Sequence, residues 1–250
     1  MGKCSPDGDR LVSRPYTPPG MADGGAFFAR PQEELAQVQP LAGALPVGPD
    51  HRQCLAALLG AAGMVPVQAH EKAEALVGEY ATLSAVLLAA AQQEGSVRLL
   101  PEAVRVLLIL VRESALRLHR ARLQRESVLC ERPALNAYLS ALMAHEKTEQ
   151  MRVLFLDAAN RLVADEVMGR GTVDHAPVYP REIVRRALVL QASSFVLVHN
   201  HPSGDVQPSA EDMRMTGQII AAARVVGLSV ADHLIVGREQ VLSMKEAGLL

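Results

Sequence analysis

The chain has 250 residues and a formal net charge of −2, which leaves room for one large domain or two small ones and argues against a protein that coats a polyanion. Apolar residues make up 49% of the sequence, yet only 3% are aromatic and Trp is absent, so alanine and leucine dominate and favour helices. No apolar run is long enough to span a bilayer, so we expect no association with a membrane.

The first segment, residues 1–49, is punctuated by proline and glycine and shows no lasting apolar periodicity. This composition predicts a disordered tail. Residues 1–14 carry charge and glycine where a signal peptide has an apolar core, so secretion is not expected. Cys4, Cys54 and Cys130 lie far apart and predict reduced thiols rather than a disulfide framework. We therefore expect a cytoplasmic protein.

Residues 50–126 show apolar positions at helical spacing and predict a small domain of several short helices. Its last helix starts near Pro101 and carries six arginines, namely Arg105, Arg112, Arg117, Arg120, Arg122 and Arg125. Arginines along one helix could contact the phosphates of a nucleic acid. A solvated polar face explains them better, because no aromatic residues are interleaved and the chain is slightly acidic.

The periodicity changes in residues 128–250, where short strands alternate with helices. The predicted strands are residues 152–157, 162–167, 194–199, 229–236 and 240–244, and the predicted helices are residues 134–143, 181–191 and 209–226. We expect Gly169, Gly171 and Thr172 to break the second strand. The order predicts a mixed β-sheet flanked by helices, which is an α+β domain, preceded by the small all-α domain and the disordered tail.

A polar cluster follows the apolar strand that ends near His199. His199 and His201 are two residues apart, so they point to the same side of an extended chain. Ser209 and Asp212 are three residues apart at the start of the next helix and are neighbours on its surface. Two histidines and a carboxylate form a ligand set typical of zinc, with a fourth position left for water.

A structural interpretation of this cluster is also available, since Ser-x-x-Asp at a helix start resembles a capping box. That interpretation explains Ser209 and Asp212 but not the two histidines beside them, so we favour a metal site in which Ser209 also caps the helix. Hydrolysis at such a site needs a general base. Glu149 and Glu146, which precede the first strand, are the two candidates.

The spacing His-x-His-x7-Ser-x2-Asp, formed by His199, His201, Ser209 and Asp212, is the JAMM motif of the MPN (JAB) metallopeptidase-like fold. More closely, the chain from about residue 128 to residue 250 resembles the bacterial RadC family. The blocks that carry the resemblance are Val153–Asp157, Asn160–Leu162, Pro180–Glu182, His199–Asp205, Pro208–Ser209, Asp232–Gly237 and Ser243.

The resemblance implies roles for individual residues. His199, His201 and Asp212 correspond to the zinc ligands, and Ser209 to the serine whose hydroxyl stabilises the developing oxyanion. The glutamate of the family precedes the first core strand, which places Glu149 ahead of Glu146 as the base. Asp232 and His233 match a family block as well, and we interpret them as structural residues or as supports for the metal ligands.

The implied activity is that of a zinc-dependent metallopeptidase-type hydrolase acting on a peptide or isopeptide bond of an unidentified peptide or protein. The alternative is a DNA-repair-associated accessory protein that binds nucleic acid through its helical domain. Residues 91–99 lack the Gly-rich turn that the family uses to contact a DNA phosphate, so they do not support that alternative. The letters His199-Asn200-His201 do not predict an HNH nuclease, whose signature is spread over a ββα unit.

Overall fold

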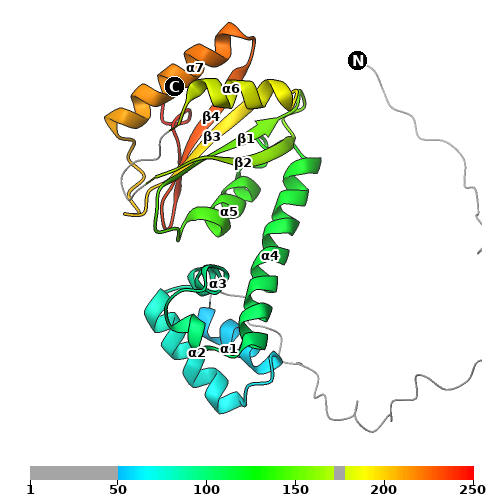
Figure 1. The fold of residues 1–250 in the computed structure, drawn as a ribbon, viewed down its shortest axis with the longest axis vertical. Coiled ribbons are helices and arrows are strands. Elements are labelled where there is room, and N and C mark those ends of the chain that lie inside the picture. The colour runs from blue at the N-terminus through cyan, green and yellow to red at the C-terminus, as the bar shows by residue number, and fades with distance from the viewer. Residues whose placement is uncertain (1–49, 172–177) are drawn as a thin grey trace, which may run out of the picture. The chain divides into compact units, whose positions relative to one another are not determined.

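The computed structural model describes residues 50–171 and 178–250 (Figure 1), all of which fall within one compact unit. The predicted disordered tail over residues 1–49 lies outside the described residues. The boundaries predicted at residues 50–126 and 128–250 stay a prediction.

Four α-helices and one 3₁₀ helix make up the first part of the described chain. They are α1 (His51–Ala61), α2 (Pro66–Tyr80), α3 (Leu83–Gln92), η2 (Gly95–Leu99) and α4 (Glu102–Arg125). Side-chain caps fix two of their starts, since Asp50 accepts from the backbone of Arg52 and Gln53, and Thr82 accepts from the backbone of Ala85. Buried leucine, valine and alanine from all five elements form one apolar core.

The second part builds a mixed sheet with helices on both faces, which confirms the predicted α+β class. Its elements are α5 (Arg132–Met143), β1 (Gln150–Leu156), β2 (Leu162–Arg170), α6 (Pro180–Val189), β3 (Ser194–Asn200), α7 (Ala210–Val225), β4 (Ser229–Val236) and β5 (Val241–Ser243). The strand order is β2-β1-β3-β4-β5, in which β3 and β4 are parallel and the other pairs antiparallel.

The second strand ends before Gly171, as predicted, but the expected break at Gly169 is wrong, and Thr172 lies outside the described residues. Gly169 pairs with Met151, and β2 continues to Arg170, which pairs with Gln150. The pairing shifts register between Met151 and Arg152, so a β-bulge absorbs the irregularity while the ladder continues.

Two apolar layers cover the sheet, and the side chains of β3 alternate between them. Val196 and Val198 pack with α5 and the end of α4, whereas Phe195 and Leu197 pack with α6 and α7. Figure 1 shows α6 and α7 together on one face of the sheet and α5 on the other. His199 continues the second series and so faces α7.

Among the described residues, no single helix is long and apolar enough to cross a membrane. Taken together, α2 and α3 reach the required length and apolarity, but the two helices are bent by 88° at the break between them.

Candidate metal centre

His199, His201 and Asp212 are brought together at the end of β3 and the first turn of α7. His199 lies on the last part of β3, and the backbone N–H of His201 donates to the carbonyl of Val236 at 3.0 Å, which extends the pairing with β4 beyond the strand. Asp212 lies in the first turn of α7. The alternation expected from the sequence therefore places both imidazoles opposite the start of this helix.

The donor atoms of these three residues face one another. His199 Nε2 lies 2.9 Å from His201 Nε2 and 3.3 Å from Asp212 Oδ1, and His201 Nε2 lies 3.7 Å from Asp212 Oδ2. Bonds of about 2.0–2.1 Å to a tetrahedral zinc would place ligand atoms roughly 3.3–3.4 Å apart. The three distances, of which the two to Asp212 end at different carboxylate oxygens, bracket that value, so the donor set fits a zinc ion in both chemistry and size.

Asp212 is held by a capping box at the start of α7. The backbone N–H and the hydroxyl of Ser209 both donate to Asp212 Oδ2, at 2.8 and 2.6 Å, and Ser209 Oγ accepts from the backbone N–H of Asp212 at 3.1 Å. Burial disfavours the charged carboxylate, but hydrogen bonds with His199, His201 and Ser209 outweigh burial and hold the pKa of Asp212 well below its usual range. Asp212 therefore stays an anion, with Oδ2 occupied by Ser209 and Oδ1 nearer His199.

His201 is oriented by a backbone carbonyl. Its Nδ1 lies 2.6 Å from the carbonyl oxygen of Asp205, which can only accept, so Nδ1 carries a hydrogen and Nε2 faces the other two candidate ligands. The hydrogen bond with Asp212 is the largest cause that raises the pKa of His201, and the charge of Glu149 raises it further.

A second pair of buried polar side chains lies behind His199. His199 Nδ1 is 2.8 Å from His233 Nε2, and His233 Nδ1 is 2.7 Å from the hydroxyl of Thr216, which donates to the carbonyl of Asp212 at 2.6 Å. Burial lowers the pKa of His233 well below its ordinary value, so the ring is neutral. Thr216 is not among the residues predicted for this site, although its spacing of four from Asp212 places both residues on one helix face.

The segment that carries Glu149 is fastened by a buried amide. Asn200 Oδ1 accepts from the backbone N–H of Gln150 at 3.0 Å, and Asn200 Nδ2 donates to the carbonyl of Thr148 at 3.1 Å. These bonds lie on either side of Glu149, and the carbonyl of Glu149 also accepts from Gly171 at 2.9 Å. Asn200 therefore fixes the backbone of the candidate base relative to the end of β3.

The competing glutamate has a different partner. Glu146 Oε2 accepts from the side chain of Gln92 at 2.9 Å, and the neighbouring Lys147 pairs with Glu94. His145 Nε2 lies 3.0 Å from the hydroxyl of Thr82. Residues 145–147 thus bind α3 and the turns that flank it.

Asp232 forms a separate network on the face of the sheet opposite to His233. Its carboxylate accepts from Arg132 at 2.6 Å, from the hydroxyl of Ser243 at 2.7 Å and from the backbone of Lys245 at 3.2 Å. It also accepts from the backbone N–H of His233 at 2.7 Å. Asp232 ties the start of α5 to the C-terminal turn, as expected of a structural residue.

The loop after His201 packs tightly against the end of β4. A Cβ atom on Gly237 would lie 2.5 Å from the carbonyl oxygen of Gly204, so only glycine allows this approach. A cavity of about 440 Å³ lies beside the loop and is lined by Ser203, Gly204, Arg238, Glu239 and Gln240. The cavity thus adjoins the residues that follow His201.

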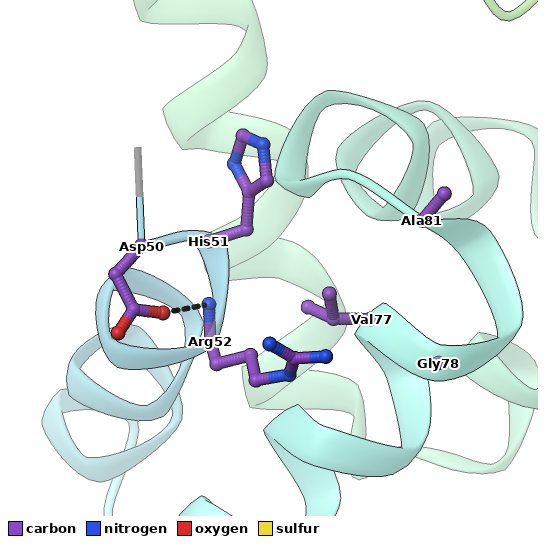
Figure 2. Close-up of a pocket in the computed structure, with 6 residues that line it drawn as sticks. All are labelled: Asp50, His51, Arg52, Val77, Gly78 and Ala81. Atoms are coloured by element: carbon purple, nitrogen blue, oxygen red, sulfur yellow. Dashed lines mark hydrogen bonds between the residues drawn. The ribbon is translucent and has the colours of Figure 1, made fainter. Parts of the chain in front are cut away.

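A larger cavity, of about 590 Å³, lies among the first helices (Figure 2) and is lined by Asp50, His51, Arg52, Val77, Gly78 and Ala81. Two of its charged groups are already engaged, since Asp50 caps α1 through the backbone of Arg52 and the side chain of Arg52 pairs with Glu74 at 2.8 Å. Volume alone does not make it a site, and the convergent donor atoms lie at the end of β3 instead.

Three of the six arginines of α4 contact the protein itself. Arg117 pairs with Glu113 at 2.8 Å, and Arg122 pairs with Glu126 at 3.0 Å and with Glu131 at 2.6 Å. Arg112 is half-buried and donates to the carbonyl of Leu142 at 3.4 Å. These contacts agree with a solvated, self-paired face, and binding to DNA stays a prediction.

Fold and site together define an α+β domain with a His-His-Asp group able to bind a metal ion. A family profile described as the RadC-like JAB domain matches residues 130–249. A UPF0758 protein of Rhodobacter capsulatus is 54% identical over 149 residues, which cover 60% of this chain and 70% of the relative. A UPF0758 protein of Ruegeria pomeroyi is 45% identical over 178 residues, which cover 71% of this chain and 80% of the relative. The chain belongs to the RadC family, as its motifs predicted.

Proposed function

We propose that this protein is a zinc-dependent hydrolase that cleaves a peptide or isopeptide bond, with His199, His201 and Asp212 as the zinc ligands. The observation that carries the proposal is the convergence of two imidazole Nε2 atoms and one carboxylate, with distances of 2.9 to 3.7 Å between them. When bound, zinc supplies a Lewis acid that polarises a carbonyl and lowers the pKa of water. Membership of the RadC-like JAB family supports the same chemistry.

Glu149 is the general base of the proposed reaction. It takes a proton from the attacking water and returns it to the nitrogen of the leaving amine, so the amide bond breaks and a carboxylate and an amine form. Two observations support this role: Asn200 fixes the backbone on both sides of Glu149, and the charge of Glu149 raises the pKa of His201. Glu146 accepts a hydrogen bond from Gln92 instead.

Ser209 is the proposed donor to the oxyanion. In the described structure its hydroxyl donates to Asp212 Oδ2 at 2.6 Å. The hydroxyl must therefore turn toward the substrate when the carbonyl oxygen gains charge, while the backbone N–H of Ser209 keeps its own bond to Asp212.

Two measurements test the proposal. Elemental analysis should find about one zinc per chain, and the zinc should be lost in His199→Ala and Asp212→Ala but kept in the control Ser243→Ala, whose hydroxyl lies in the separate Asp232 network. Hydrolysis is then sought with a panel of peptides and isopeptide-linked conjugates in ¹⁸O-labelled water, because a hydrolytic product carries the label in its new carboxylate.

Glu149→Gln separates catalysis from metal binding. We expect this variant to retain zinc and to lose about 10²–10⁴-fold in rate, the usual contribution of a general base. A folded wild-type protein that takes up no zinc after dialysis against it would refute the metal site. A fully active Glu149→Gln enzyme would refute the role of Glu149 while leaving the ligands in place.

A further inference from the structure

We propose that Arg238 is a specificity-determining residue of the hydrolase, and that it binds a carboxylate group of the substrate peptide beside the metal site. The inference rests on the zinc hydrolase proposed above and deepens it by naming an acidic peptide as the class of substrate. Its basis is the cavity of about 440 Å³ that Arg238 lines together with Ser203 and Gly204 of the loop after His201.

The backbone and the stem of Arg238 are held in place by two glycines. Gly237, directly before it, is buried, and a Cβ atom on Gly237 would lie 2.5 Å from the carbonyl oxygen of Gly204. The stem of Arg238 lies over Gly204, because a Cβ atom there would meet Arg238 Cγ at 3.3 Å. Gly204 has a φ of +91°, a conformation that favours glycine. Turn and loop are therefore packed together, and Arg238 has a defined position at their junction.

The guanidinium of Arg238 keeps donors for a ligand. Its Nη2 donates to the carbonyl of Pro202 at 3.3 Å, which is its only hydrogen bond within the described residues. No carboxylate of the described chain forms an ion pair with Arg238, in contrast to Arg186 and Arg214, which are both paired at 2.5 Å. A guanidinium has five N–H groups, arranged to hold a carboxylate through two parallel hydrogen bonds. Arg238 is exposed, so a substrate can reach it.

The charge of Arg238 also lies near the segment that carries Glu149. Burial of the His145 ring is the largest cause that lowers its pKa, and the charge of Arg238 is the next. A neighbouring charge acts on a pKa in this way at short range. His145 precedes Glu149 by four residues, and Pro202 directly follows His201. Arg238 is thus flanked by the loop of a proposed metal ligand and by the segment of the proposed base, and a substrate must lie between these two parts.

The cavity limits how far the bound carboxylate lies from the scissile bond. Gly204 is three residues after His201, and three residues of chain span at most roughly 11 Å. The loop is tighter than that limit, since the N–H of Gly204 donates to the carbonyl of His201 at 2.9 Å. An acidic side chain or a C-terminal carboxylate within about three residues of the scissile bond therefore reaches Arg238.

One acidic side chain of the protein opposes this binding. Glu239 lines the same cavity and is exposed, and its negative charge repels a carboxylate. Salt and exposure weaken both interactions, so we expect an acidic peptide to bind only about 3–5-fold more tightly than a neutral one at low salt. Glu239→Gln should increase this preference.

The test compares three peptides bound to the full chain labelled with ¹⁵N, with and without one equivalent of zinc. They are a pentapeptide with a central glutamate and both ends blocked, the same peptide with glutamine, and the glutamine peptide with a free C-terminal carboxylate. Affinities are measured from the shifts of backbone amide signals. We expect one or both carboxylate peptides to bind more tightly than the blocked glutamine peptide and to shift the amides of Gly204 and Gly237. The two carboxylate peptides distinguish an acidic side chain from a C-terminus.

Three variants show whether Arg238 causes the preference. Arg238→Gln should bind all three peptides alike, because no cation is left to pair with the carboxylate. Arg238→Glu should instead favour a blocked peptide with a central lysine. Arg224→Gln is the matched control and should keep the wild-type preference. It removes the same charge from an exposed arginine in the last turn of α7, about 18 Å along the helix from Asp212.

A purely structural role, in which Arg238 only links the turn to the loop, would change the affinity of all peptides by the same factor. Equal affinity of the wild type for all three peptides overturns the inference, as does binding of none of them or an undiminished preference in Arg238→Gln. The wild-type comparison stands even where a variant fails to fold. Selective binding without hydrolysis would reject the proposed function and keep the Arg238 site, whereas hydrolysis without a preference for a carboxylate would do the reverse.

Discussion

Asp232 and His233 are neighbours in β4, both fully buried, yet their side chains enter two different kinds of polar network. The network of Asp232 is closed, because its carboxylate is matched by the guanidinium of Arg132, a hydroxyl and backbone N–H groups. The network of His233 is open, because it ends at His199 Nε2, which faces two further donor atoms. The pleat of one strand thus separates a structural ion-pair network from the proposed metal site.

The difference shows why buried polar groups cannot be assigned a role from burial alone. The carboxylate of Asp232 finds all of its hydrogen-bond partners within the protein, and its ion pair with Arg132 contributes through the cost of breaking it. A buried chain of hydrogen bonds that ends where His199 Nε2 faces further donor atoms agrees with the proposed binding of an external cation. Mutations on the two faces of β4 should therefore change different observables.

The largest effect is expected for Asp232→Ala. It leaves Arg132, whose side chain is 24% exposed, without its buried carboxylate, and breaking such a pair typically costs about 3–5 kcal/mol. Urea unfolding monitored by circular dichroism measures this loss. The folded fraction should still bind zinc with wild-type affinity. A parallel loss of zinc affinity would contradict the prediction that the two faces of β4 act independently.

A smaller effect on stability is expected for Asn200→Ala. The backbone N–H of Gln150, which is buried, loses its acceptor, and an unsatisfied buried donor costs about 1–3 kcal/mol. Zinc binding should persist, because Asn200 contacts the backbone around Glu149 and not the three donor atoms. Asn200→Asp keeps the acceptor for Gln150 and is the comparison variant; equal loss of stability in the two variants would contradict this account.

The sequence allowed the core of the site to be placed because its determinants are local. Strand alternation relates His199 to His201, and helix periodicity relates Ser209 to Asp212. The fold class followed in the same way from the order of strands and helices. Each of these relations spans only a few residues and needs no knowledge of the sheet order.

The supporting contacts could not be placed in advance because they join distant segments. His199 meets His233 only because β3 and β4 are parallel neighbours with a register shift that sets their side chains side by side. The family resemblance placed Glu149 ahead of Glu146, but the contacts that distinguish the two come from Asn200 and Gln92, each about 50 residues away in the chain.

The smallest predicted effect is the change of protein stability with pH. It should arise from the candidate metal ligands on the His233 side of β4 and not from the Asp232 network. His201 has a raised pKa, so its interaction with Asp212 stabilises the metal-free protein fully below the unfolded value of about 6.5 and is lost as pH rises through the folded value. Asp212 has a lowered pKa, so its contribution is present above about 3.9 and is lost as pH falls. The pair therefore contributes most between about pH 4 and pH 6.5.

Added zinc should reverse the loss of stability that the metal-free protein shows as the pH rises. Zinc competes with the proton for His201 Nε2, so its stabilisation grows with pH while that of the proton declines. Thermal unfolding across pH 5 to 9, with and without zinc, should give two curves that diverge as pH rises. His201→Ala should abolish the divergence and Asp232→Ala should preserve it at lower stability, because His201 belongs to the open network and Asp232 to the closed one.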